Sequence, residues 1–140
     1  MSHVASENNS KLAGKGLESQ AMRIDLERLT HKYTASHEAT MSVAEWDKAE
    51  REYRRFLTLK HLYPSVTLVP SKEAHAIWHA HILDTRAYRL DCHRLFGRFI
   101  DHYPYLGIYG EKDYNEFEAA LAKTAELYEK HFGSYPDFCT

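Results

Sequence analysis

Residues 71–97 read SKEAHAIWHAHILDTRAYRLDCHRLFG, and this segment dominates the fold that we expect. Ser71 is a residue type that caps helix N-termini, and Gly97 is the type that most often follows their last turn. No glycine or proline interrupts the residues between them. We therefore predict one helix from Lys72 to about Phe96, roughly 40 Å long at ~1.5 Å per residue.

One face of this predicted helix gathers polar side chains around His75. With an advance of about 100° per residue, six residues lie within about 40° of it. They are His79, Ile82, Arg86, Arg89, His93 and Gly97. A second, mainly apolar arc holds Trp78, His81, Thr85, Tyr88, Cys92, Leu95 and Phe96. The opposite side carries Glu73, Asp84 and Asp91, which is typical of a solvent-facing surface.

His75 and His79 are spaced to hold one metal ion. Side chains one turn apart have Cβ atoms ~5–6 Å from each other, so two imidazoles reach the same ion. A third protein ligand comes from a facing element in such sites. His102 is our candidate, because its loop follows the helix closely and folds back over it. Three nitrogen ligands with open positions suit iron, copper or zinc.

Arg86 and Tyr103 are the candidate catalytic residues beside this site. Arg86 is suited to hold a carboxylate or phosphate of a substrate. The alternative is an ion pair with an acidic residue of the preceding helix, which we expect for Arg89. Candidate partners are Glu45, Asp47 and Glu50. The tyrosines near His102 either line a pocket for an aromatic substrate or cap the helices; they are Tyr103, Tyr105 and Tyr109.

The remaining histidines have a simpler interpretation. We expect His81, within the apolar arc, to be a hydrogen-bonded core residue, and His93 to be structural. Asp84 is either a ligand or orienter of the metal or a solvent-facing group, and its helical phase favours solvent. Cys92 is predicted to be a buried, inert thiol. Five further histidines are predicted to lie on the surface: His3, His31, His37, His61 and His131.

The rest of the chain predicts three more helices and a flexible arm. Residues 1–16 are polar and predict a disordered N-terminal arm. Helices are expected over residues 17–33, from the Ser42–Glu45 capping box to Leu62, and over residues 112–132 before Gly133. Residues 65–70 and 99–110 are predicted to be extended or irregular loops. The prediction is an all-α helical bundle of about four main helices, with residues 17–140 as one domain.

Composition excludes several classes of function. The 140 residues carry a net charge of -2 without a long basic run, which argues against nucleic acid as a partner. No apolar run approaches the ~20 residues that span a membrane, and no signal peptide is evident. Cys92 and Cys139 are too few for a disulfide scaffold. We expect a cytoplasmic protein with a small-molecule substrate and no membrane partner; the sequence leaves its oligomeric state open.

Part of the chain resembles a known family. The resemblance lies in Trp78-His79-Ala80-His81-Ile82-Leu83-Asp84-Thr85, Tyr88, Cys92, Phe96-Gly97, His102-Tyr103-Pro104, Thr124, Leu127-Tyr128 and Phe132-Gly133. This pattern, spread over about residues 44–136, resembles the glycine-rich domain-containing protein-like family. The resemblance implies a helical module and no particular activity.

This sequence departs from that family at His75, where the family often has an acidic residue three positions before Trp78. A carboxylate and an imidazole are both metal ligands, so the exchange is compatible with a metal site as well as with a structural role. The glycine-rich tail of the plant members does not occur in this sequence.

The sequence therefore predicts a metal-dependent enzyme that acts on a small molecule. Iron or copper would serve oxidation by oxygen, which we favour because the site region is aromatic and has no evident acid/base carboxylate. Zinc would serve hydrolysis or lyase chemistry by activating water. The alternative is a non-catalytic protein-interaction module with structural histidines. Haem ligation by one or two histidines is a third hypothesis.

Overall fold

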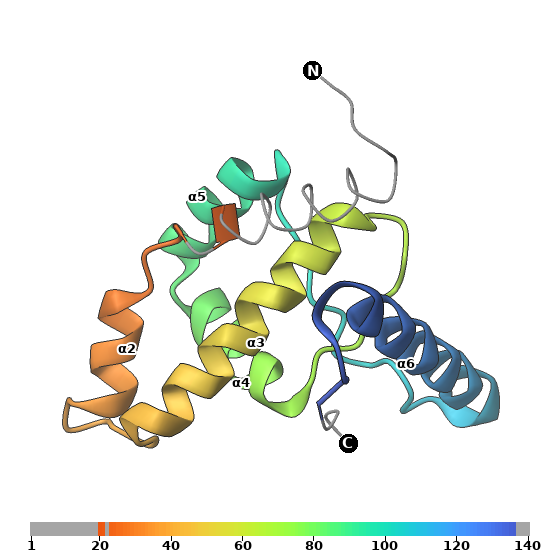
Figure 1. Cartoon of the computed structure of the whole chain (residues 1–140), viewed down its shortest axis with the longest axis horizontal. Coiled ribbons are helices and arrows are strands. Elements are labelled where there is room, and N and C mark those ends of the chain that lie inside the picture. Colours follow the sequence, from red (N-terminus) through yellow and green to blue (C-terminus); the bar gives the residue numbers. More distant parts are fainter. Residues whose placement is uncertain (1–19, 22, 137–140) are drawn as a thin grey trace.

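The computed structural model describes residues 20, 21 and 23–136, and five α-helices have their bounds within them (Figure 1). They are α2 (Glu27–Thr34), α3 (Val43–Leu62), α4 (Lys72–Leu83), α5 (Thr85–Phe96) and α6 (Gly110–Phe132). The described residues contain no β-strand, so the predicted all-α class is confirmed for them. The predicted arm, residues 1–16, lies outside the described residues.

Helix α3 is the centre of the fold. It contacts α2, α4 and α6, and α5 joins the assembly through α4. Figure 1 shows α3 running diagonally between α2 on one side and α6 on the other. The apolar side of α3 is fully buried, including Trp46, Tyr53 and Leu57. Because α2, α4 and α6 all pack against α3, their buried apolar residues form a single hydrophobic core.

Local sequence signals set both ends of α3 as predicted. The Ser42 hydroxyl accepts from the Glu45 N–H, and the Glu45 carboxylate accepts from the Ser42 N–H, which completes the capping box. The helix ends at Leu62, two residues before Pro64. Residues 65–70 then form an extended loop without helix or strand, as predicted.

The helix predicted over residues 17–33 is wrong in its described part, because α2 begins only at Glu27. The Asp25 carboxylate accepts from the Glu27 N–H and starts a new helix. The buried guanidinium of Arg54 takes the carbonyl oxygens of Ala21 and Ile24 as acceptors. Those carbonyls would bond within the helix if it continued, so the tertiary contact replaces the helical one.

The single helix predicted over residues 72–96 is also wrong, because it divides at Asp84, which has φ −85° and ψ 73°. The Trp78 indole N–H donates to the Tyr88 hydroxyl at 3.0 Å, and His81 Nε2 lies 2.8 Å from Asp91 Oδ2. Both pairs are ten residues apart, a separation of ~15 Å along a straight helix. The break lets α5 fold back onto α4, which is why the helix count exceeds the predicted four.

Helix α6 is held to the rest by buried polar contacts. The Val69 N–H donates to the Thr124 hydroxyl at 2.9 Å, and the Tyr128 hydroxyl donates to the Glu52 carboxylate at 2.7 Å. The predicted helix 112–132 is confirmed, with two more residues at its start and Gly133, at φ 100°, after its end. These contacts fix the loop of residues 65–70 between α3 and α6.

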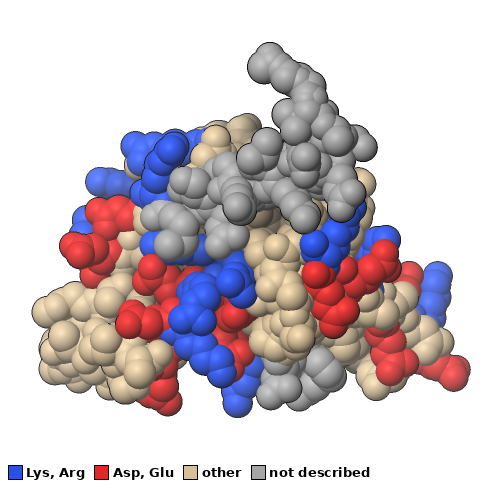
Figure 2. Space-filling model, viewed as in Figure 1, with Lys and Arg blue, Asp and Glu red and all other residues tan. Residues whose placement is uncertain are grey.

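The surface gives no sign of one dominant charge on the face in view. Acidic and basic side chains intermingle there (Figure 2). No helix among the described residues combines the length and apolar character needed to cross a lipid bilayer.

The contact between Tyr63, which directly follows α3, and His131 of α6 predicts that the free energy of unfolding depends on pH. His131 Nε2 lies 2.7 Å from the Tyr63 hydroxyl. Burial, and then the charge of Lys130, lowers the pKa of His131 below its usual value. The unfolded chain therefore binds a proton at His131 at a higher pH than the folded chain, and the free energy of unfolding falls as the pH drops below about 6.5.

We expect His131→Gln to reduce the loss of unfolding free energy between about pH 7 and pH 5, measured by urea denaturation at both values. His31→Gln, at an exposed position of α2, is the matched control and should leave that loss unchanged. An equal loss in wild type and His131→Gln would contradict the assignment.

Candidate metal centre

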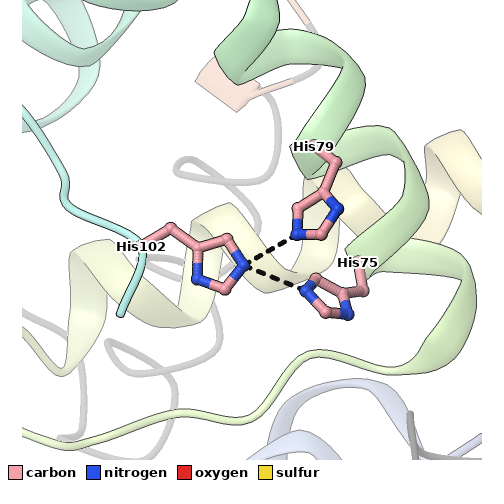
Figure 3. Close-up of side chains that lie close together, drawn as sticks. All are labelled: His75, His79 and His102. Atoms are coloured by element: carbon pink, nitrogen blue, oxygen red, sulfur yellow. Dashed lines mark hydrogen bonds between the residues drawn. The ribbon is translucent and has the colours of Figure 1, made fainter. Parts of the chain in front are cut away.

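Three histidine side chains converge at one point beside α4 (Figure 3). His102 Nε2 lies 3.0 Å from His75 Nε2 and 2.8 Å from His79 Nε2. The potential ligand atoms of the three residues all lie within 4.8 Å of one another. The structure thus brings together the three residues that the sequence predicted as metal ligands.

Helix α4 presents two of the three imidazoles. Ser71 caps its N-terminus, with the hydroxyl accepting from the Ala74 N–H, as predicted. His75 and His79 follow one turn apart, and their ring centroids are 4.1 Å from each other. The i and i+4 positions of a regular helix therefore place both rings on the same side.

The third imidazole comes from the loop after α5. The Tyr88 hydroxyl donates to the Ile100 carbonyl at 2.6 Å, two residues before His102. The His102 ring stacks on the Trp78 indole, with centroids 4.4 Å apart and planes 12° from parallel. The loop is thus held to α5 through Ile100 and to α4 through His102. It begins at Gly97, which has the left-handed conformation at φ 73°.

The electrostatics favour the neutral form of two of these imidazoles, those of His75 and His102. Burial, followed by the neighbouring His79 and His102, lowers the pKa of His75 to about 4. Burial and then His79 also lower the pKa of His102, against a hydrogen bond to the Tyr103 backbone that raises it. Neutral histidines keep a lone pair available for a metal ion, since a protonated imidazole is no ligand.

The distances suit a small transition-metal ion. Metal–nitrogen bonds of ~2.0–2.1 Å at a tetrahedral angle separate the nitrogens by ~3.3 Å. The contacts of 2.8 and 3.0 Å around His102 Nε2 need only a few tenths of an ångström of adjustment. An all-imidazole set favours zinc, copper, iron or nickel over magnesium and calcium, which prefer oxygen ligands.

A pocket of about 530 Å³ adjoins the three histidines, and His75 and His102 form part of its wall. Its size is within the range of sites for small molecules. Tyr103 lines it and is 59% exposed, which places this predicted residue at an open part of the pocket. Tyr105 and Tyr109 do not line it.

Arg86 does not join the site, and its predicted place beside the metal ligands is wrong. The break at Asp84 ends the helical phase that linked His75 to Arg86, Arg89 and His93. All three lie exposed on α5. In the described part of the chain neither arginine forms an ion pair, so the predicted pairing with α3 is absent there too. Glu50, one predicted partner, instead binds Arg54.

His81 has the core role that was predicted. It is 2% exposed, and its Nδ1 lies 2.7 Å from the Tyr53 hydroxyl. Since a carboxylate oxygen accepts, the His81 Nε2–H donates to Asp91 Oδ2. Asp91 was predicted to face solvent and is instead largely covered by this contact. Asp84, the residue of the break, is half-buried and away from the three ligands.

Cys92 and the other histidines divide between confirmed and corrected predictions. Cys92 is buried, and burial raises the pKa of its thiol, as expected of an inert residue. His31 and His37 are exposed, as predicted, whereas His3 lies outside the described residues. His61 and His131 are half-buried and hydrogen-bonded, the former to the Leu95 carbonyl. The surface prediction is wrong for these two.

Two contributors to this region were not predicted from the sequence. Trp78 was assigned only to the apolar arc, but it also supports His102. Lys60 lines the pocket and was not considered at all. A signal for Lys60 existed: it stands four residues after Phe56 and seven after Tyr53, on the buried side of α3.

A comparison with known protein families assigns the chain to one of them. The model of the UCP032817-like family matches residues 20–121, well over half of the chain, and the chain therefore belongs to this family. The match includes all three converging histidines and states no activity. Curated proteins and solved structures gave no match. The resemblance to the glycine-rich domain-containing protein-like family stays a prediction.

The position of His102 rests on a buried hydroxyl, which gives a testable prediction. Tyr88 is 1% exposed, and its hydroxyl bonds both Trp78 and Ile100. Tyr88→Phe leaves a buried N–H and a buried carbonyl without this partner. We expect the free energy of unfolding to fall by about 1–3 kcal/mol, measured by urea denaturation.

The matched control is Tyr114→Phe, because Tyr114 is 50% exposed on α6. This change should stay within about 0.5 kcal/mol of wild type. If Tyr88→Phe behaves like this control, the hydroxyl does not hold the loop.

Proposed function

We propose that this member of the UCP032817-like family is a metal-dependent enzyme with one iron, copper or zinc ion bound by His75, His79 and His102. The observation that carries the proposal is the close approach of three imidazole nitrogens. His75 Nε2 lies 3.0 Å and His79 Nε2 2.8 Å from His102 Nε2. Three imidazoles from two separate elements meet there, and their lone pairs match the needs of one ion.

A ligand set of three supports catalysis more than a purely structural site. Structural zinc sites are closed by four protein ligands, whereas catalytic sites keep a position open for water or substrate. Within the described residues the cluster holds three histidines and no cysteine or carboxylate. The open side adjoins the pocket of about 530 Å³, which gives a small molecule access to the ion.

The chemistry that we propose is oxidation of a small molecule by oxygen, for which an iron or copper ion held by the three histidines would supply the redox chemistry. Among the described residues that line the pocket, the one carboxylate is Asp101, and it is exposed. Hydrolysis and lyase chemistry rely on a general acid or base with a tuned pKa, and an exposed carboxylate offers little tuning. Lys60 also lines the pocket and has a lowered pKa because of burial, but we propose that its ammonium group binds the substrate. His75 and His102 bind the ion in this scheme, and Tyr103 contacts the substrate from the open part of the pocket.

A non-catalytic interaction module is the second candidate. The observation that favours it is a row of exposed tyrosines beside the histidines. Tyr103 and Tyr105 have ring centroids 5.6 Å apart, and Tyr105 and Tyr109 5.8 Å. Exposed aromatic groups are enriched in protein interfaces. This candidate requires no bound metal, so metal content separates the two.

The decisive experiment measures metal by mass spectrometry in protein purified without a histidine tag. Wild type should carry close to one iron, copper or zinc ion per chain. His79→Ala should lose at least about tenfold in metal affinity, because it removes one of three ligands. His93→Ala is the matched control, since His93 is exposed on α5 outside the cluster, and it should keep the metal.

The identity of the ion then tests the chemistry. Iron or copper supports oxidation, whereas zinc has no redox chemistry and would overturn the oxidative part while leaving the metal site intact. A wild-type protein that carries no metal and takes up none of the three added ions would leave the interaction module as the better hypothesis.

A further inference from the structure

Lys60 is the one cationic side chain among the described residues that line the pocket beside the three histidines. Its Nζ lies 5.5 Å from the centroid of the Phe56 ring and 5.6 Å from that of Trp78. The Trp78 indole also stacks on His102, so one aromatic ring borders both the ammonium group and a proposed metal ligand. The positive charge of Lys60 is thus fixed near the metal centre.

This ammonium group lacks an acidic partner. In the region that the structure describes, Lys60 forms no ion pair and no hydrogen bond, and its side chain is half-buried. Burial, and then the nearby charge of Arg98, lowers the pKa of Lys60. A partly desolvated cation that forms no ion pair is stabilised by any anion that enters the pocket.

The remainder of the pocket is mostly apolar. Six of its apolar and aromatic lining residues are Val66, Leu68, Val69, Trp78, Leu106 and Phe117. A ligand therefore needs an apolar body as well as a negative charge. The space of about 530 Å³ accommodates a molecule of this type.

We infer that the pocket binds a small organic carboxylic acid, with the carboxylate on Lys60 and the apolar body against the wall formed by residues 64–70 and Phe117. This inference names the substrate class of the proposed enzyme and rests on that function for its metal.

Two other ligand classes fit less well. A cationic ligand would need Asp101, whose carboxylate is exposed and screened by water, while Lys60 would repel it. A phosphate ester carries nearly two charges and is held by several donors, often at a helix N-terminus. A single ammonium group in an apolar pocket matches one negative charge.

The test compares 3-phenylpropionate with its neutral amide, 3-phenylpropionamide, by isothermal titration calorimetry. Both metal-loaded and metal-free proteins are titrated. We expect the carboxylate to bind roughly tenfold more tightly than the amide, the size of one charge-assisted hydrogen bond. Lys60→Met should abolish this preference, and Lys60→Arg should keep most of it.

Lys48→Met is the matched control, because Lys48 lies on the same helix with a side chain that is 62% exposed. It should leave the preference unchanged. Metal content should be normal in all three variants, so a failure of the metal site is seen separately from a failure of the carboxylate site.

Each outcome decides the inference. A preference that is lost in Lys60→Met and persists in metal-free wild type supports it. A preference that survives in Lys60→Met and disappears on removal of the metal would place the carboxylate on the ion and overturn it. Equal binding of both ligands by wild type, or binding of neither, would overturn it as well.

Discussion

The Tyr88 hydroxyl accepts a hydrogen bond from the Trp78 indole and donates one to the Ile100 carbonyl. This pair of bonds joins α4, α5 and the loop that carries His102. Without these two bonds, the packing of α5 against α4 would be weaker. The loop would also lose the contact that holds His102 near His75 and His79. The candidate metal centre therefore depends on a contact between residues outside the histidine cluster, and metal sites commonly rely on such supporting groups.

The break at Asp84 shows where sequence reasoning fails and why. Periodicity assumes a continuous helix, and nothing between Lys72 and Phe96 is a strong helix breaker. The break is instead stabilised by side-chain bonds between α4 and α5, namely Trp78 with Tyr88 and His81 with Asp91. Such contacts depend on the folded geometry and have little local sequence signal. The one local signal is Asp84, a residue type that often precedes the first turn of a helix.

The convergence of the three histidines was predictable for a related reason. His75 and His79 are neighbours on one turn, and that relation survives whatever happens beyond Asp84. His102 required only that the loop return over α4, which its short distance along the chain favours. The predicted position of Arg86 beside the histidines was wrong because it assumed one continuous helix across the break at Asp84. Local spacing was reliable over one turn and unreliable over three.

Trp78 links the stability of the fold to the proposed chemistry. Its indole N–H supports Tyr88, one side of its ring stacks on His102, and Lys60 lies near the same ring. A residue that contacts the core, the proposed metal ligand His102 and the proposed anion-binding group of Lys60 is constrained in size, planarity and hydrogen bonding at once. Phenylalanine would keep the apolar packing and lose the N–H, whereas a smaller residue would also leave the His102 ring unsupported. In this small domain the candidate site is thus a continuation of the core, because the Trp78 indole that bonds Tyr88 of α5 also borders both His102 and Lys60.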